Sequence, residues 1–291
     1  WGTLTAQNFT SATDTYNTAV GYASGNDITT GQFNTLIGGL AGDALTDADK
    51  NVAIGAVALS TDTQGSKSTA VGYGALSTQN FTSATDSHNT AVGHASGSVL
   101  TTGVNNVLIG SLTGDALTDA DFNVAMGFQA LTTDTKGSQS TAIGHHALQT
   151  QNFTTATNSQ NVAVGYQAGK ASTTATNNTF LGFQAGLTNV AASNNTALGS
   201  RALTTNTESH NVAVGDQALE THNIASNTSG ANTVVGYQAA TAVTTGKEQT
   251  IMGYQALSSE TNGIASTAFG YQALKAQNGA GATNVYNVAV G

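Results

Sequence analysis

The clearest metal-binding pattern in the sequence lies in two acidic segments that are near copies of each other. Asp47 and Asp49 alternate in GDALTDADKN, and Asp119 and Asp121 do so in GDALTDADFN. Carboxylates at alternate positions can gather around Ca²⁺. The glycine and the distant glutamate of an EF-hand loop are missing, so a solvated acidic turn is the main interpretation and a Ca²⁺ site is the alternative. We expect no other cofactor.

The histidines raise the question of acid–base catalysis. In the internal repeat of this chain, His94 and His145 occupy the place that Tyr22 and Tyr166 hold in other copies. A catalytic base must carry a proton at a defined point in the reaction, so it cannot be exchanged with tyrosine from copy to copy. We therefore expect no catalytic residues and no enzyme activity.

Aromatic side chains form two recurrent sets that could contact a ligand or a neighbouring chain. One set directly follows a repeated glycine, and the other lies in Thr-rich stretches such as TQNFTSATDSHN. The members are Tyr166, Tyr237, Tyr254 and Tyr271 in the first set and Phe9, Phe81 and Phe153 in the second. Stacked down a flat face, the tyrosines could cradle sugars or pack at a subunit interface. The phenylalanines recur too regularly for one specific site and suit a repeated contact, with a neighbouring chain or with a repetitive ligand.

The composition excludes several function classes. Charged residues make up 8% of the chain, the net charge is −9, and cysteine and proline are absent. Nucleic acids and anionic membranes attract clustered Lys and Arg, which this chain lacks. A bilayer-spanning helix needs about 18 or more consecutive apolar residues, and no such run occurs. We therefore expect neither nucleic-acid binding nor membrane insertion by this segment.

A five-residue phrase, Asn-Thr/Val-Ala-Val/Ile-Gly, recurs sixteen times and organises the chain. Successive phrase glycines mostly keep a 17-residue spacing, as from Gly21 to Gly38, and a longer step, as from Gly72 to Gly93, recurs to produce a superperiod of 72. The superrepeats cover about 1–72, 73–144, 145–215 and 216–291, and the extra residues fall in the Thr-rich stretches. Structural repeat residues include the phrase asparagines Asn17, Asn89, Asn161 and Asn211 and the glycines that close the same phrases, Gly21, Gly93, Gly165 and Gly215.

These units predict an all-β solenoid with almost no helix. The β-branched triplet of each phrase is typical of a strand, and the following glycine permits a turn. A segment such as Tyr254–Leu257 is a candidate second strand, and the Thr, Asn, Asp and Gly residues between strands indicate turns. A 17-residue unit cannot bury its own apolar side, but stacked coils can. In that stack the repeated asparagines should form a side-chain amide ladder.

The phrase followed by Tyr-Gln-Ala-Leu resembles the head repeats of YadA-type trimeric autotransporter adhesins. It is also similar to repeat segments of bacteriophage tail fibres and tail-fibre-like adhesins. The resemblance covers essentially the whole chain and implies a left-handed parallel β-roll that trimerises side by side into a fibre. It also implies an extracellular, cell-surface or virion location. Coils of this length are longer than usual head repeats, and the superperiod is a further departure from that family.

The resemblance also suggests which side chains face the interior. The predicted inward residues are Thr18, Val20, Val52, Ile54, Val162 and Val164. The alanines between them, such as Ala53 and Ala163, would then face a closely packed neighbour.

Three functions remain open. The first is a structural or adhesive shaft of a phage tail fibre or bacterial surface adhesin, with itself and host glycans or a receptor as partners. The second is a purely structural extracellular filament or sheath. The third is an ice-binding solenoid, which the irregular alternation of Thr and Val at the second phrase position disfavours. Because the chain starts just after a glycine position and ends on one, we expect it to be a single repeat domain of sixteen coils from a longer array.

Overall fold

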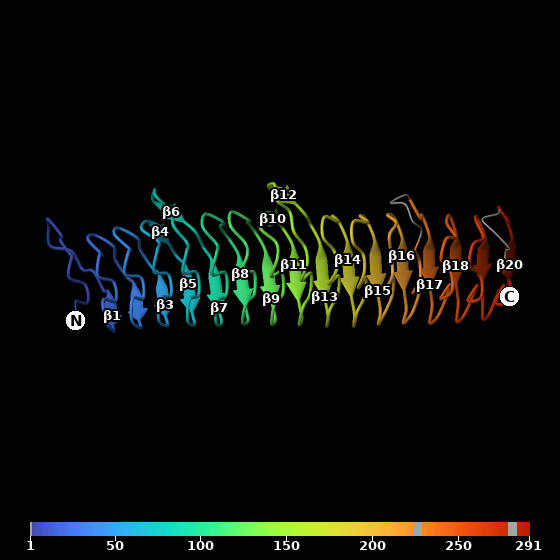
Figure 1. The fold of residues 1–291 in the computed structure, drawn as a ribbon, viewed down its shortest axis with the longest axis horizontal. Helices are drawn as coiled ribbons and strands as arrows, with labels where there is room; N and C mark the ends of the chain where they lie inside the picture. Colours follow the sequence, from blue (N-terminus) through green and yellow to red (C-terminus); the bar gives the residue numbers. More distant parts are fainter. Residues whose placement is uncertain (1, 224–228, 279–283) are drawn as a thin grey trace. The chain divides into compact units, whose positions relative to one another are not determined.

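The structure, a computed structural model, describes residues 2–223, 229–278 and 284–291. It divides into two compact units. Unit 1 comprises Trp1–Ser140 together with Asn152–Asn158, and unit 2 comprises Thr141–Gln151 together with Ser159–Gly291. The described residues of both units form strands and turns and no helix (Figure 1). The prediction of an all-β chain is confirmed.

Unit 1 is a parallel β-solenoid in which each coil adds one short strand to a main sheet (Figure 1). Each strand is the triplet that precedes a phrase glycine, and neighbouring strands pair at the same phrase position, as Thr18 does with Thr35. The main strands are β1 (Thr18–Val20), β2 (Thr35–Ile37), β3 (Val52–Ile54), β5 (Thr69–Val71), β7 (Thr90–Val92), β8 (Val107–Ile109) and β9 (Val124–Met126).

Unit 2 repeats this architecture with the same parallel register, for example Thr233 opposite Thr250. Its strands are β11 (Thr141–Ile143), β13 (Val162–Val164), β14 (Thr179–Leu181), β15 (Thr196–Leu198), β16 (Val212–Val214), β17 (Thr233–Val235), β18 (Thr250–Met252), β19 (Thr267–Phe269) and β20 (Val288–Val290). The predicted solenoid of about 17-residue coils is therefore confirmed in each unit.

In unit 1 the Thr-rich stretches of the long coils leave the regular path, and each pairs with the preceding regular coil in a small two-stranded parallel sheet. Strand β4 (Gly65–Ser66) pairs with β6 (Thr85–Asp86), and β10 (Gly137–Ser138) pairs with β12 (Thr157–Asn158). Figure 1 draws β6 and β12 at the upper rim, away from the arrows of the main sheet. The residues just before β6, at positions 82–84, are exposed.

The predicted second strand after the phrase glycine is wrong, because this segment is a series of turns. Gln255 and Leu257 have φ angles of +49° and +52°, in the left-handed region that strands do not occupy. Each such residue costs about 1 kcal/mol of backbone strain. Hydrogen bonds between coils offset this strain, since the backbone N–H of Gln255 donates to the carbonyl of Tyr237 at 2.9 Å. The segment thus forms the corner of the coil.

The phrase glycine is required by the close approach of neighbouring coils. Gly38 has a φ of +141°, and a Cβ atom placed on it would lie 2.4 Å from the carbonyl oxygen of Gly55 in the next coil. No side chain fits at that distance. Stacking therefore explains why a glycine closes each phrase.

The predicted facing of the strand residues is also wrong. Ala53 and Ala163, in the middle of their triplets, are fully buried, whereas Val20, Ile54 and Val162 are 57%, 37% and 37% exposed. Alternate strand residues face opposite sides of a sheet, so one side chain per triplet points inward and two point outward. In these triplets the alanine lies inside and the larger apolar residues lie outside.

The volume of the interior is balanced between two positions of the repeat, within a coil or between neighbouring coils. Where the middle strand residue is large, as at Phe180, a glycine faces it, and a Cβ on Gly186 would lie 2.4 Å from the Phe180 ring. Where the middle residue is alanine, the same position holds either a buried leucine, as Leu59 after Ala53, or a glycine that makes room for a large side chain of a neighbouring coil, as Gly169 does for Phe180. This exchange keeps the packing dense while the coil cross-section stays constant.

Candidate interaction surfaces

The repeated asparagines form the predicted amide ladder. Asn34 and Asn51 are fully buried. The Oδ1 atom of Asn34 accepts the backbone N–H of Asn51 at 2.9 Å, and its Nδ2 atom donates to the carbonyl of Ala48 at 2.8 Å. The Oδ1 atoms of Asn17, Asn89, Asn161 and Asn211 accept the corresponding backbone N–H in the next coil. These side chains hold neighbouring coils together.

Phe81 and Phe153 are buried against their own chain, with 6% and 7% of their surface exposed. The ring of Phe81 lies over Gly65, where a Cβ would approach it to 2.7 Å. Phe9 is half-buried. The prediction that Phe81 and Phe153 form a ligand or lateral contact is therefore wrong. Their rings anchor the projecting segments to the coil below.

A buried acid fastens each of these two segments. Asp62 is fully buried, and its Oδ1 atom accepts the backbone N–H groups of Gly65 and Phe81, each at 3.0 Å. Its Oδ2 atom accepts a hydrogen bond of 2.6 Å from the Nε2 atom of Gln79. Asp134 makes the same two backbone contacts to Gly137 and Phe153. Three donors compensate the burial of the Asp62 carboxylate without a cation.

Asp62 and Asp134 are not among the predicted site residues, although the repeat carries a signal for them. Asp62 and Asp134 lie one superperiod apart and occupy the coil position that Leu45 and Leu117 hold in other coils. An acid at a core position, always one coil before an insertion, indicates a buried polar anchor.

The acidic segments serve the solenoid backbone. The Oδ1 atoms of Asp49 and Asp121 accept the backbone N–H of Gln32 and Val104 in the preceding coil, each at 2.8 Å. Asp47 is exposed, and Asp119 forms an exposed ion pair with Lys136 at 3.7 Å. Within the described residues, no group of three or more His, Cys, Asp or Glu side chains could hold a metal ion.

The histidines take structural places. His94 stacks on Tyr73 with ring centroids 5.5 Å apart, as its place in the repeat suggests. His222 is fully buried, and its Nε2 atom lies 2.8 Å from the carbonyl oxygen of Gly246 and 3.5 Å from Oε2 of Glu208. Burial lowers the pKa of His222, partly opposed by the hydrogen bond to Gly246. In the repeat, His222 occupies the same position as Gln79, a hydrogen-bonded core residue of another long coil.

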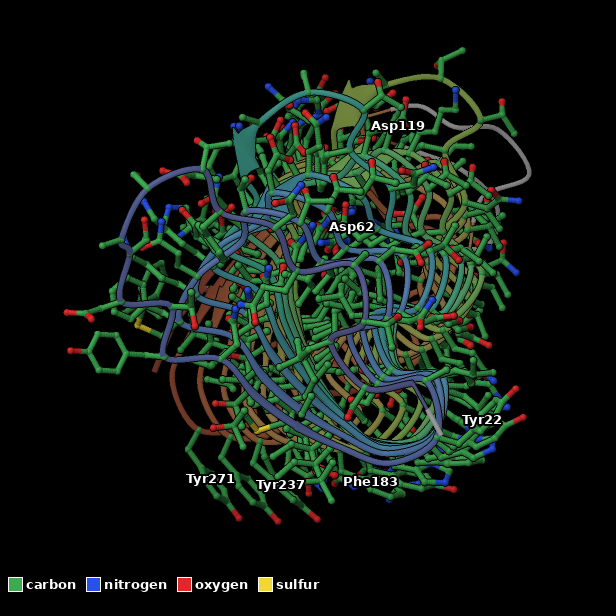
Figure 2. All side chains as sticks on the ribbon, turned by 90° about the vertical axis from the view of Figure 1, so that its left-hand side faces the viewer. Tyr22, Asp62, Asp119, Phe183, Tyr237 and Tyr271 are labelled. Atoms are coloured by element: carbon green, nitrogen blue, oxygen red, sulfur yellow. The ribbon has the colours of Figure 1, made fainter. Side chains whose placement is uncertain are left out.

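The tyrosines after the phrase glycine form an exposed ladder. The Tyr237 and Tyr254 centroids are 5.4 Å apart with an interplanar angle of 16°, and those of Tyr254 and Tyr271 are 5.2 Å apart at 6°. Tyr166 stacks on Phe183 in the same way. Figure 2 shows Phe183, Tyr237 and Tyr271 projecting outward from unit 2. Because the rings cover one another's faces, they offer a partner their edges and hydroxyl groups.

A second exposed row consists of the last residue of each main strand, and we call it the apolar row. Large members in unit 1 are Ile37, Ile54 and Met126, and large members in unit 2 are Leu181, Leu198 and Met252, all between 37% and 45% exposed. Contiguous exposed apolar side chains mark interaction surfaces in soluble proteins. The outer face of each main sheet therefore has the character of a contact surface.

The two units differ strongly in charge. Unit 1 contains eleven acidic and three basic residues, for a net charge of −8, whereas unit 2 contains five acidic and four basic residues, for a net charge of −1. The exposed tyrosine ladder of unit 2 therefore belongs to a unit with almost no net charge.

Comparison with models of known protein families finds no match, and comparison with curated proteins finds none either. Among the described residues, no helix is long and apolar enough to cross a membrane.

Proposed function

We propose that this chain is a shaft segment of an extracellular attachment fibre, as in a phage tail fibre or a bacterial surface adhesin. In this proposal several copies, three by the resemblance of the repeats, pack side by side as left-handed rolls. The chain supports attachment and carries no catalytic activity. The observation that carries the proposal is the apolar row on the outer face of each main sheet.

The strand pattern supports a contact between copies through this face. A monomeric solenoid would place polar residues outside, because alternation along a strand separates a solvent face from a core face. Here the last residue of every main strand is apolar, from Val20 to Val290. Burying such a row against a second copy removes it from water at about 25 cal/mol per Å². Since the row recurs in every coil, the contact area grows with fibre length.

The experiment is a mass measurement by light scattering on the native chain and two variants. Replacing Met126 in the apolar row with arginine should lower the mass of the assembly, because a charge would be buried without a partner. Thr102→Arg, at an exposed place outside the main sheet, should leave it unchanged. A native chain that is monomeric at every concentration would overturn the proposal. Mass that keeps growing with concentration would favour an open filament over a closed trimer.

A further inference from the structure

We propose that unit 2 carries a binding surface for a linear, uncharged polysaccharide that lies along the coil axis. The surface, here the Tyr–Gln ladder, consists of Tyr237, Tyr254 and Tyr271 and of Gln238, Gln255 and Gln272. This inference rests on the proposed attachment function and names the class of polymer that the fibre would attach to.

The glutamines form a hydrogen-bonded row directly beside the tyrosines. The Nε2 atom of Gln272 donates to Oε1 of Gln255 at 3.0 Å, and Nε2 of Gln255 donates to Oε1 of Gln238 at 2.9 Å. A primary amide has two N–H groups, and the row uses one of them per residue. The glutamines are half-buried, so the second N–H can reach solvent. The row therefore presents one amide donor per coil.

The tyrosines add a parallel set of polar groups. Tyr237 and Tyr254 are each 43% exposed and Tyr271 is 69% exposed. Stacking directs their hydroxyl groups away from the coil, as Figure 2 shows for Tyr237 and Tyr271. A phenolic hydroxyl both donates and accepts hydrogen bonds. Each coil thus offers one hydroxyl and one amide, at neighbouring chain positions.

The chemistry of the ligand follows from this regular arrangement. Coils stack at about 4.8 Å, so a matching ligand must repeat its own polar groups at that spacing along an extended chain. An extended β-1,4-linked glycan advances by one sugar at about this interval. Successive sugars are turned over, so each coil meets hydroxyl groups of one sugar and the same hydroxyl group returns at every second coil. The side chains of the ladder carry no charge, and among the described residues the ammonium group of Lys275 donates to Oε1 of Gln255 at 2.9 Å. A neutral polymer suits such a surface better than a charged one.

The surface is arranged before any ligand binds. Ring stacking and amide pairing already restrict the side chains, so binding would lose little of their conformational freedom. Each coil contributes only weak contacts, but a polymer spanning several coils engages them together, which raises the overall affinity. The ladder is therefore suited to a long chain and poorly suited to a single sugar.

The test measures retention of the native chain on amorphous cellulose and on chitin, with the double variant Tyr254→Ala/Gln255→Ala as the main comparison. Alanine already stands at the Gln255 position in other coils, as Ala23 and Ala95 with φ angles of +51°, so the variant should fold. The control is Tyr22→Ala in unit 1, where the exposed ring is followed by Ala23 and no glutamine row exists. Circular dichroism checks the β content of each protein.

We expect the native chain and Tyr22→Ala to be retained on at least one polymer, and the double variant to bind about tenfold more weakly, as expected for one or two lost hydrogen bonds. Absence of retention on both polymers, or equal retention of the double variant, would overturn the inference. Light scattering on the same samples distinguishes failure of the polysaccharide surface from failure of the proposed fibre. A monomeric chain that binds the polymer contradicts side-by-side assembly alone, whereas an assembled chain that does not bind contradicts the ladder alone.

Discussion

Replacing Asp62 with alanine should release the first projecting segment while the coils around it stay intact. Asp62 accepts three hydrogen bonds from buried donors, namely the backbone N–H groups of Gly65 and Phe81 and the side-chain amide of Gln79. Leaving a buried donor unpaired costs about 1–3 kcal/mol. Three orphaned donors therefore cost about 3 kcal/mol even at the low end of that range.

Global unfolding is a poor assay for this change, because a solenoid unfolds as a series of coupled repeats. Native-state hydrogen exchange is better suited, since it reports local opening. A loss of about 3 kcal/mol raises the local opening equilibrium by about 100-fold. We expect faster exchange of this order at residues 79–87 and near-native exchange in the strands of distant coils.

The control variant is Asp47→Ala, which removes an exposed carboxylate from the same solenoid unit. It should leave exchange at residues 79–87 unchanged. If Asp62→Ala also leaves that segment protected, the buried acid does not anchor it. Uniform loss of protection across all coils would instead assign Asp62 a general role in stability.

Three further predictions test other contacts. Because burial lowers the pKa of His222, the unfolded chain takes up its proton at a higher pH than the folded chain; the free energy of unfolding should fall as pH drops through about 6.5. A His222→Gln variant should show a smaller loss of melting temperature between pH 7 and pH 5, and an unchanged loss would refute this. Gly38→Ala should lower the melting temperature, because its Cβ would meet the Gly55 carbonyl oxygen, whereas Gly39→Ala has open space and should not. Calcium titration should give neither heat nor a higher melting temperature, because the carboxylates of Asp49 and Asp121 already accept backbone N–H groups; a rise that Asp121→Asn abolishes would restore the calcium site.

Periodicity alone was enough to place every main strand and the asparagine ladder. A phrase that recurs at 17-residue intervals must stack in register, because each coil can bury its apolar side only against the next. Asparagine at the first phrase position then meets asparagine, and one side chain can satisfy two backbone groups of the next coil, as Asn34 does. These features follow from local sequence and repetition.

Periodicity does not predict which side chains of a strand face the interior. The resemblance of the repeats placed Val52 and Ile54 in the interior, and both are more hydrophobic than Ala53. Hydrophobicity predicts the interior only if one face of the strand meets water, and here the outer face is apolar too. The alanine is inside because the interior at that level is already filled by leucines such as Leu59. Only the packing of a whole coil reveals this limit on volume.

In the long coils, too, some features follow from the sequence and others only from the tertiary structure. Their place along the chain follows from the spacing of the phrase glycines, and so does the regular return of Phe81 and Phe153. Whether those rings face a partner or their own chain depended on contacts between residues far apart in sequence. Asp62 reaches forward to the backbone of Phe81, and Gly65 leaves room for its ring. Repetition determines which residues stack, but the three-dimensional closure of each coil decides which of them remain available to a partner.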